Sequence, residues 1–144
     1  MSDAGCVFCE IVAGRSPASF VHQDDEVVAF VDIRPVNSGQ LVVAPRRHAE
    51  LLTELPSTTW ARVAEVAQML AAAARRVPDV RCEAVNLIVA DGIAAGQEVL
   101  HAHMLVIPRF DGDGFGFRVP PGFGQFLARP DMDAIAAKIR SAIA

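Results

Sequence analysis

Two histidines, His101 and His103, stand two residues apart in an otherwise apolar run. We expect residues 98–107 to form a β-strand that Pro108 closes, and side chains two positions apart in a strand project from the same face. His101, His103 and Leu105 would therefore share one face. The other face would carry Leu100, Ala102, Met104 and Val106. A neutral imidazole can attack phosphorus or bind a metal ion, so the histidine face is a candidate chemical site rather than a packing surface.

A glycine-containing loop directly precedes this strand, with Gly92 and Gly96 around a short apolar stretch and Gln97 beside it. Glycine has no Cβ, so the backbone at these positions can approach a ligand closely. The N–H groups of the glycines and the Gln97 amide can donate hydrogen bonds to phosphate oxygens. A glycine loop alone is weak evidence, but its junction with the two histidines favours a phosphate-binding site.

The cysteines form a second group: Cys6 and Cys9 are spaced as Cys-x-x-Cys, and Cys82 is the third. An odd number of cysteines argues against a disulfide framework. Residues 1–5 carry neither a basic nor an apolar stretch, so we expect no secretory signal and a reducing, cytoplasmic location. There, Cys-x-x-Cys indicates either half of a metal site or a redox pair, whereas Cys82 is interpreted as a buried, inert thiol.

The composition restricts the partners of the protein. The chain has 144 residues, 52% of them hydrophobic, which predicts a single domain over residues 1–144 with its own core. No apolar run approaches the roughly 20 residues of a membrane span, so we expect no membrane insertion. The net charge of −4 argues against binding to the DNA or RNA backbone and favours a small anion held by local groups.

Apolar periodicity and turn residues predict the elements that position these groups. The expected elements are a short helix over 6–13, a hairpin over 20–33 turning at 23–26, a strand over 41–44, a helical turn within 48–54, a long helix capped by Ser57 and ending before Pro78, strands over 84–90 and 98–107, and a helix over 130–143. One long helix between two groups of hairpin-like strands predicts an α+β fold with an antiparallel sheet. The irregular stretch 111–122 is interpreted as a lid or a dimer contact.

The segment from Ala95 to Arg109, AGQEVLHAHMLVIPR, resembles the signature strand of histidine triad (HIT) proteins of the Hint-like bacterial branch. Three further segments resemble the family in the right order: 6–12 its opening, 29–35 its nucleoside-binding strand and 41–48 its next strand. The resemblance covers a core of about residues 6–110. The tail, 111–144, is similar to the extension of some bacterial members.

This resemblance implies a HIT-like fold with a five-stranded antiparallel sheet per chain, one long helix and a C-terminal helix, and a homodimer with a ten-stranded sheet. It also implies that the chain binds a purine nucleotide such as AMP or GMP. The reaction would be attack by His103 on the α-phosphate of phosphoramidates, acyl-nucleotides or dinucleotide polyphosphates, assisted by His101. Water would then hydrolyse the nucleotidyl-His103 intermediate, which divides one difficult displacement into two easier ones.

The resemblance also assigns binding roles to several residues. Asp32 would bind the ribose hydroxyls, although an aspartate there could simply cap the turn before Pro35. The remaining nucleotide contacts would be Phe8, Ile11 and Ile33 around the base, and Gly96, Gln97 and His103 at the phosphate. Of these, Ile11 is equally well explained as a core residue.

The resemblance further implies a structural Zn²⁺ bound by Cys6, Cys9, His48 and His101, since two thiolates and two imidazoles suit tetrahedral zinc. The alternative is that the cysteines are ordinary helix residues and that His48 is a polar residue at a strand end. His22 has no partner that the sequence identifies, so we interpret it as a surface residue.

Three positions depart from the family pattern: Leu105 stands in place of the third triad histidine, Gln40 in place of the histidine after Gly39, and Ala90 in place of a phosphate-binding asparagine. Leu105 cannot donate a proton to a leaving group, and such assistance is worth roughly a hundredfold to ten-thousandfold. We therefore keep three hypotheses: a nucleotide hydrolase or transferase, a catalytically weak nucleotide-binding module or sensor, and a zinc-stabilised structural dimer.

Overall fold

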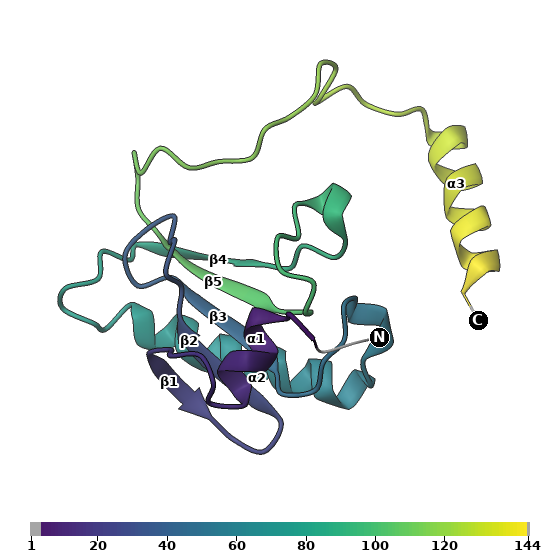
Figure 1. Cartoon of the computed structure of the whole chain (residues 1–144). Helices are drawn as coiled ribbons and strands as arrows, with labels where there is room; N and C mark the ends of the chain where they lie inside the picture. The colour runs from purple at the N-terminus through teal and green to yellow at the C-terminus, as the bar shows by residue number, and fades with distance from the viewer. Residues whose placement is uncertain (1–3, 144) are drawn as a thin grey trace.

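The computed structural model describes residues 4–143 and contains a five-stranded antiparallel sheet with helices around it (Figure 1). The strands are β1 (Phe20–Gln23), β2 (Val27–Val31), β3 (Leu41–Pro45), β4 (Ala84–Ile88) and β5 (Met104–Arg109), in the spatial order β1-β2-β3-β5-β4. The helices are α1 (Val7–Val12), α2 (Ser57–Ala74) and α3 (Arg129–Ala142). The predicted α+β class with an antiparallel sheet is confirmed.

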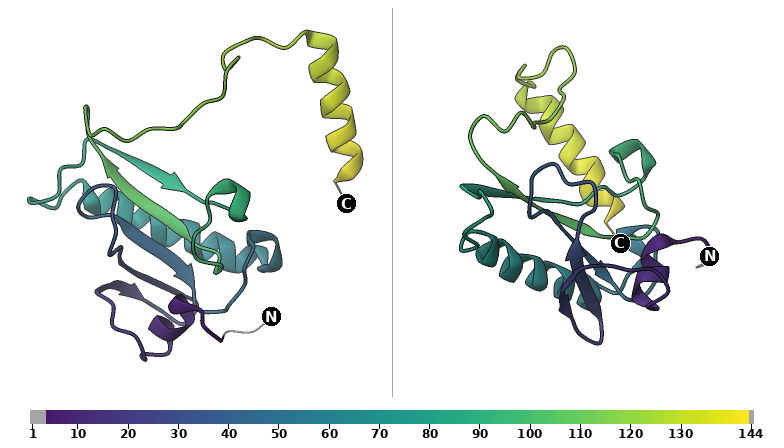
Figure 2. Two further views of the ribbon diagram at one scale, coloured as in Figure 1. Left: turned by 45° about the horizontal axis from the view of Figure 1, so that its top comes forward. Right: turned by 60° about the vertical axis from the view of Figure 1, so that its left-hand side comes forward.

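The central strands are covered on both faces, which explains why β2 and β3 contain no charged residue. Helix α2 runs along one face, where its apolar stripe packs on alternate strand residues (Figure 2). The opposite face carries α1, whose Phe8 and Ile11 pack on Val28, Phe30 and Val42. Burying each such aliphatic or aromatic side chain stabilises the fold by roughly 1.5–3 kcal/mol.

The strand predicted over residues 98–107 is shorter than expected at its start. β5 begins at Met104, so residues 98–103, with both histidines, precede the hydrogen-bonded ladder. The ladder starts there because β4 ends at Ile88 and β3 pairs with β5 no further than Met104. The preceding segment is held instead by the N–H of Ala102, which donates to the carbonyl of Ala49 at 2.7 Å.

The side chains of this part of the chain still point alternately to the two faces of the sheet, because an extended backbone alternates whether or not it is hydrogen-bonded to a neighbouring strand. Leu105 packs on the Phe8 side of the sheet and Met104 on the α2 side. At its other end β5 continues through Pro108 to Arg109, contrary to the prediction that Pro108 closes it. Proline is tolerated there because the β3 side of the strand is no longer paired.

Other boundaries differ by a few residues. Ser57 is the first residue of α2 rather than its cap, which is Pro56. The expected helical turn within 48–54 is a 3₁₀ turn, Leu52–Glu54, and the glycine loop contains another, Ile93–Ala95. Residues 1–3, which carry part of the argument against a secretory signal, lie outside the described residues.

The segment after β5 leaves the body of the molecule and ends in α3, which stands apart from the sheet in Figure 1 and in the left view of Figure 2. None of its described side chains is buried, and Ile135 and Ile139 are among its exposed apolar residues. Within residues 4–143, no helix has the length and apolar character that a bilayer crossing requires.

Candidate functional site

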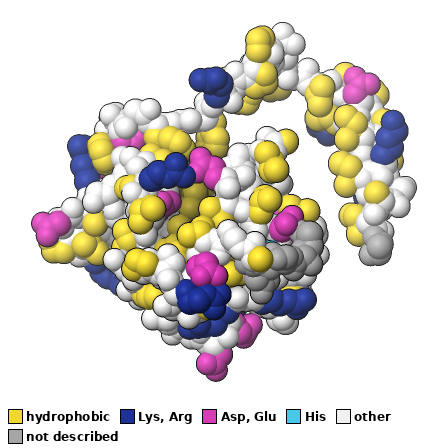
Figure 3. Space-filling view, viewed as in Figure 1, with side chains coloured by type: hydrophobic (Ala, Val, Ile, Leu, Met, Phe, Trp, Pro, Cys, Tyr) yellow, Lys and Arg dark blue, Asp and Glu magenta, His cyan; other side chains and the backbone are white. Residues whose placement is uncertain are grey.

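A cavity of about 730 Å³ lies over the sheet face opposite α2, within the size range of small-molecule sites. Figure 3 shows this face hollowed near its middle, with hydrophobic side chains along the recess. All seven residues predicted to contact a nucleotide line it: Phe8, Ile11, Asp32, Ile33, Gly96, Gln97 and His103. Gln40, Ala90 and Leu105, the three positions at which the sequence predicted a departure from the resembled pattern, line the same cavity.

His103 is half-buried in the cavity wall, and its hydrogen bonding defines its chemistry. Its Nδ1 lies 2.7 Å from the carbonyl oxygen of His101. A carbonyl can only accept, so Nδ1 carries the proton and Nε2 keeps its lone pair. Burial, the largest influence, lowers the pKa of His103, although the His101 carbonyl and the charge of Asp32 act in the opposite direction. The neutral ring therefore presents a nucleophilic nitrogen.

Asp32 is bound into the turn that follows β2, and it also lines the cavity. One carboxylate oxygen accepts from the N–H of Arg34 at 2.9 Å, and the other accepts from Nε2 of Gln40 at 2.7 Å. The turn-capping interpretation is thus confirmed. A carboxylate has about four acceptor sites, so Asp32 keeps acceptor capacity toward the cavity.

Gln40 is a site residue whose role the sequence did not reveal. Its side chain is buried, and its Oε1 accepts from the N–H of Val36 at 2.8 Å while its Nε2 donates to Asp32. The amide is therefore held at both ends and orients the carboxylate. Two polar residues eight positions apart give no local signal of such contact.

The glycine loop corrects one prediction. The N–H of Gly92 donates to Oε1 of Gln97 at 2.7 Å, and that of Gly96 donates to the carbonyl of Ile93 at 2.9 Å. The side-chain amide of Gln97 donates to the carbonyls of Glu50 and Val99. The groups expected to be free phosphate donors are thus used within the protein, and Gln97 holds the loop in place.

Backbone conformation explains the two loop glycines. Gly92 and Gly96 have φ values of 103° and 90°, a region that L side chains rarely adopt. No other heavy atom would crowd a Cβ at either position. Both glycines are therefore required by the turn itself, whatever ligand approaches it.

A second cluster lies beside the cavity, where the ligand atoms of Cys6, Cys9, His48 and His101 all fall within 4.8 Å of one another. The Nδ1 of His101 lies 3.5 Å from Sγ of Cys6 and 3.6 Å from Sγ of Cys9. The Nδ1 of His48 lies 3.3 Å from Sγ of Cys9. Sulfur and nitrogen ligands of one tetrahedral zinc ion are expected about 3.5 Å apart, so the arrangement fits that ion.

The two histidines of the cluster are held differently. His101 is fully buried, and its Nε2 donates to the carbonyl of Pro45 at 2.8 Å, which leaves the Nδ1 lone pair facing the thiols. Among the described residues, no hydrogen-bond partner reaches the buried Nε2 of His48. Of these two histidines, only His101 therefore has its tautomer defined by a hydrogen bond to a backbone carbonyl.

The catalytic role of the His101 side chain stays a prediction, and the ring is not among the residues that line the cavity. The ring faces Cys6 and Cys9, while the backbone carbonyl oxygen of His101 accepts a hydrogen bond from Nδ1–H of His103. Both histidine rings touch Phe8 edge-on, with centroid distances of 5.7 Å to His101 and 5.1 Å to His103. His101 consequently contacts residues of both the cluster and the cavity.

Leu105 lines the cavity and belongs to the apolar cluster around Phe8, Phe30 and Val42. This side chain therefore packs as a hydrophobic residue and offers the cavity no hydrogen-bond donor.

Two smaller expectations also change. His22 has a partner, because its Nε2 lies 2.8 Å from the carboxylate of Asp24, which Arg62 also binds. Cys82 is partly exposed rather than buried.

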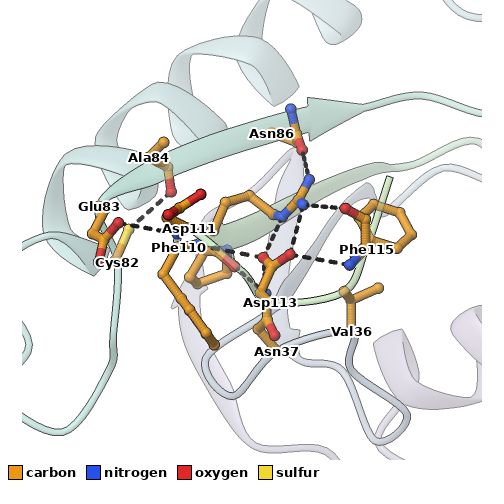
Figure 4. A network of polar contacts seen from close by, with 12 residues as sticks. Val36, Asn37, Cys82, Glu83, Ala84, Asn86, Phe110, Asp111, Asp113 and Phe115 are labelled. Carbon is orange, nitrogen blue, oxygen red and sulfur yellow. Dashed lines mark hydrogen bonds and ion pairs between the residues drawn. The ribbon is translucent and has the colours of Figure 1, made fainter. Parts of the chain in front are cut away.

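A polar network beyond β5 was not foreseen (Figure 4). Asp113 lies at its centre and joins the loop after β5 to Asn37 of the turn after β2, and Arg109 reaches Asn86 of β4. The loop brings Phe115 and Phe117 into the cavity wall. In the sequence, two closely spaced aromatic residues, Phe115 and Phe117, could have indicated a role in the cavity. They were overlooked because they lie in a glycine-rich stretch interpreted as an irregular loop.

Comparisons with known proteins agree with this geometry. The sequence profile of the HIT domain matches residues 13–112. The Arabidopsis thaliana adenylylsulfatase HINT3 is 32% identical over 108 residues, which are 75% of this chain and 54% of that protein. A HIT family protein from Bacillus anthracis has a TM-score of 0.87 at 28% identity, over 98% of this chain and 99% of that chain. A zinc-bound histidine triad family protein from Mycobacterium smegmatis has a TM-score of 0.75 at 36% identity, over 99% and 100% of the two chains.

Proposed function

This chain belongs to the HIT domain family, as its motifs predicted, and on that premise we propose that it is a nucleotide hydrolase or transferase. The reaction is displacement at the α-phosphate of a purine nucleotide derivative, through a covalent nucleotidyl-His103 intermediate. One observation carries the proposal: the bond from Nδ1 of His103 to the His101 carbonyl leaves Nε2 as the free nucleophile in the cavity.

The first step forms the bond between Nε2 of His103 and phosphorus as the leaving group departs with its electron pair. The ring becomes cationic, and its Nδ1–H then donates more strongly to the His101 carbonyl. In the second step water attacks phosphorus, Nε2 recovers its electron pair, and the nucleoside monophosphate is released with one proton. The adenylylsulfatase relative supports attack on an adenylyl group in this fold.

The nucleoside lies at the α1 end of the cavity. Ile33 is 93% exposed although it lines the cavity, so this large apolar side chain has almost no protein packing of its own. Together with Phe8 and Ile11, which line the same cavity, it suits contact with a purine base. Asp32 then accepts hydrogen bonds from the ribose hydroxyls.

The Cys6, Cys9, His48 and His101 cluster binds one structural Zn²⁺ in this proposal, supported by the four converging ligand atoms and the zinc-bound mycobacterial relative. When bound, zinc supplies a cross-link and takes no part in the displacement. Through His101, the cross-link would fix the carbonyl that orients His103.

A homodimer with a continuous ten-stranded sheet is also part of the proposal. β4 is an edge strand with Leu87 exposed, so its free edge can pair with the same strand of a second copy. Light scattering at a series of concentrations measures the mass, and a monomer at all concentrations contradicts this arrangement.

The direct test of the function is a single-turnover assay with a fluorogenic adenosine 5′-phosphoramidate, together with mass spectrometry of the acid-quenched protein. We expect a nucleotidyl adduct on His103 that forms and decays with product release. AMP or GMP should also raise the melting temperature. At a hundredfold excess over Kd, the bound nucleotide adds about 2.7 kcal/mol to the free energy of unfolding. Binding of AMP without any adduct would instead identify the weak binding module that Leu105 suggests.

A further inference from the structure

One exposed ion pair joins two segments of the cavity wall. A guanidinium nitrogen of Arg34 lies 3.0 Å from a carboxylate oxygen of Glu98, and both residues line the cavity. Arg34 belongs to the turn that follows β2, two residues beyond Asp32. Glu98 directly follows Gln97, in the segment between the glycine loop and His103. The pair therefore connects the turn that carries the proposed ribose ligand to the segment that leads to the nucleophile.

The charges along the cavity wall are few and unequal. Among the described residues that line the cavity, Arg34 is the only arginine or lysine, and Asp32 and Glu98 are the only carboxylates. His103 is neutral with its proton on Nδ1, so it adds no positive charge. A phosphate is an anion, and two nearby carboxylates disfavour it unless a cation accompanies it. Arg34 is the side chain of this wall that can supply the cation.

The donors that the sequence predicted for the phosphate are already used within the protein. The N–H groups of Gly92, Gly96 and Gln97 donate to acceptors in the glycine loop. The side-chain amide of Gln97 donates to two backbone carbonyls. A guanidinium carries five N–H donors in a planar fork that matches two phosphate oxygens, so Arg34 can supply the donors that the loop does not.

The ion pair is also easily opened. The side chain of Arg34 is 78% exposed and that of Glu98 is 76% exposed, so water solvates both charges. Exposed pairs of this kind contribute little to stability, because solvent screening and side-chain entropy offset most of their attraction. A phosphate offers the guanidinium more negative charge and a second oxygen in the geometry of the fork. It therefore competes well with the single carboxylate oxygen that Arg34 contacts.

We infer that Arg34 binds the phosphate of the nucleotide and that Glu98 holds the Arg34 guanidinium in the nucleotide-free protein, so that the guanidinium moves from carboxylate to phosphate when the nucleotide binds. This inference rests on the proposed function. Arg34 is then a specificity-determining residue, since it distinguishes a nucleotide from a nucleoside. Glu98 opposes binding in two ways, because it competes for Arg34 and repels the phosphate.

The test measures the Kd of the full chain for AMP and for adenosine, which differ only in the phosphate, by titration calorimetry. We expect Arg34→Gln to raise the Kd for AMP about tenfold and to leave the Kd for adenosine unchanged, because only AMP loses a charged hydrogen bond. Glu98→Gln should act in the opposite direction and lower the Kd for AMP about threefold, because Arg34 no longer has to leave a carboxylate.

Two further variants control for charge and shape. Arg34→Lys keeps the charge but not the planar fork, so it should recover only part of the affinity for AMP that Arg34→Gln loses. Arg76→Gln is the matched control, since Arg76 is exposed beyond the end of α2 and does not line the cavity. It removes one positive charge from the protein and should change neither Kd.

The signs of the two neutral variants separate this role from a structural one. If the ion pair only held the two segments together, Arg34→Gln and Glu98→Gln would both weaken binding of AMP and of adenosine, and that result would overturn the inference. An unchanged Kd for AMP in Arg34→Gln would overturn it as well. In either case, a nucleotidyl adduct on His103 of the native protein would leave the proposed function standing. Absence of both AMP binding and the adduct in the native protein would overturn both.

Discussion

The cysteine-histidine cluster and the cavity each contain one of two histidines that are only two residues apart, and opposite ring nitrogens of these histidines face the two sites. His101 donates through Nε2 to the carbonyl of Pro45, which leaves Nδ1 facing the cysteines. His103 donates through Nδ1 to the carbonyl of His101, which leaves Nε2 for the cavity. The carbonyl that each ring meets therefore decides which nitrogen keeps its lone pair, Nδ1 beside the cysteines in His101 and Nε2 in His103.

Removing the nucleophile should have the largest effect and should affect the cavity alone. We expect His103→Ala to reduce turnover below about one thousandth of the native rate, because the first bond to phosphorus cannot form. Its metal content and melting temperature should stay close to native, which inductively coupled plasma mass spectrometry and calorimetry measure. Turnover at the native rate in this variant would contradict the mechanism.

Disrupting the cysteine-histidine cluster should lower the stability of the protein more than it lowers turnover. Cys9→Ser removes the sulfur that lies near both His48 and His101, so we expect bound zinc to fall from about one per chain to near zero. The free energy of unfolding should drop by at least about 2.7 kcal/mol, the value for a ligand at a hundredfold excess over its Kd.

Cys82→Ser is the control for that change, since Cys82 lies outside the cluster and should leave zinc and stability near native. If zinc is supplied during purification and neither the native protein nor Cys82→Ser retains any, the cluster is a packing feature. The contrast between the two histidines would then not involve a metal site.

Restoring the third histidine should sharpen the contrast inside the cavity. We expect Leu105→His to accelerate phosphoramidate cleavage by about tenfold or more, because the new imidazole can protonate the departing amine. Cleavage of acyl-nucleotides should change little. A series of adenosine 5′-derivatives with graded leaving groups measures this, and equal sensitivity in both proteins would show that position 105 does not act on the leaving group.

The smallest effect should come from the residue that orients Asp32. Gln40→Ala removes one hydrogen bond to the carboxylate, which contributes about 1 kcal/mol, so the Kd for AMP should rise roughly fivefold. Deoxyadenosine monophosphates lacking ribose hydroxyls distinguish the cause, because their binding should be less sensitive to the substitution. An unchanged Kd for AMP would mean that the turn alone orients Asp32.

Much of the fold was predictable because the signals are local. Apolar runs bounded by Pro45 and by the polar turn at 23–26 identify β2 and β3, and the helical spacing after Ser57 identifies α2. The extent of β5 was not predictable, since the strand begins where its neighbours supply partners rather than where its own pattern begins. The cavity residues named from motifs do gather in one place, but the hydrogen bonds of Gln97 and Gln40 depend on distant backbone.

The sequence by itself determined which residue types were available and which faces they would share, because alternation and glycine conformations are properties of the local backbone. Only the tertiary structure decided what each group does. Cys6 meets His101 across 95 positions of the chain, and the Pro45 carbonyl meets the same ring across 56. The tautomer of an imidazole depends on the acceptor that folding brings to it, so the difference between the ring nitrogens that His101 and His103 leave unprotonated arises from packing rather than from their spacing.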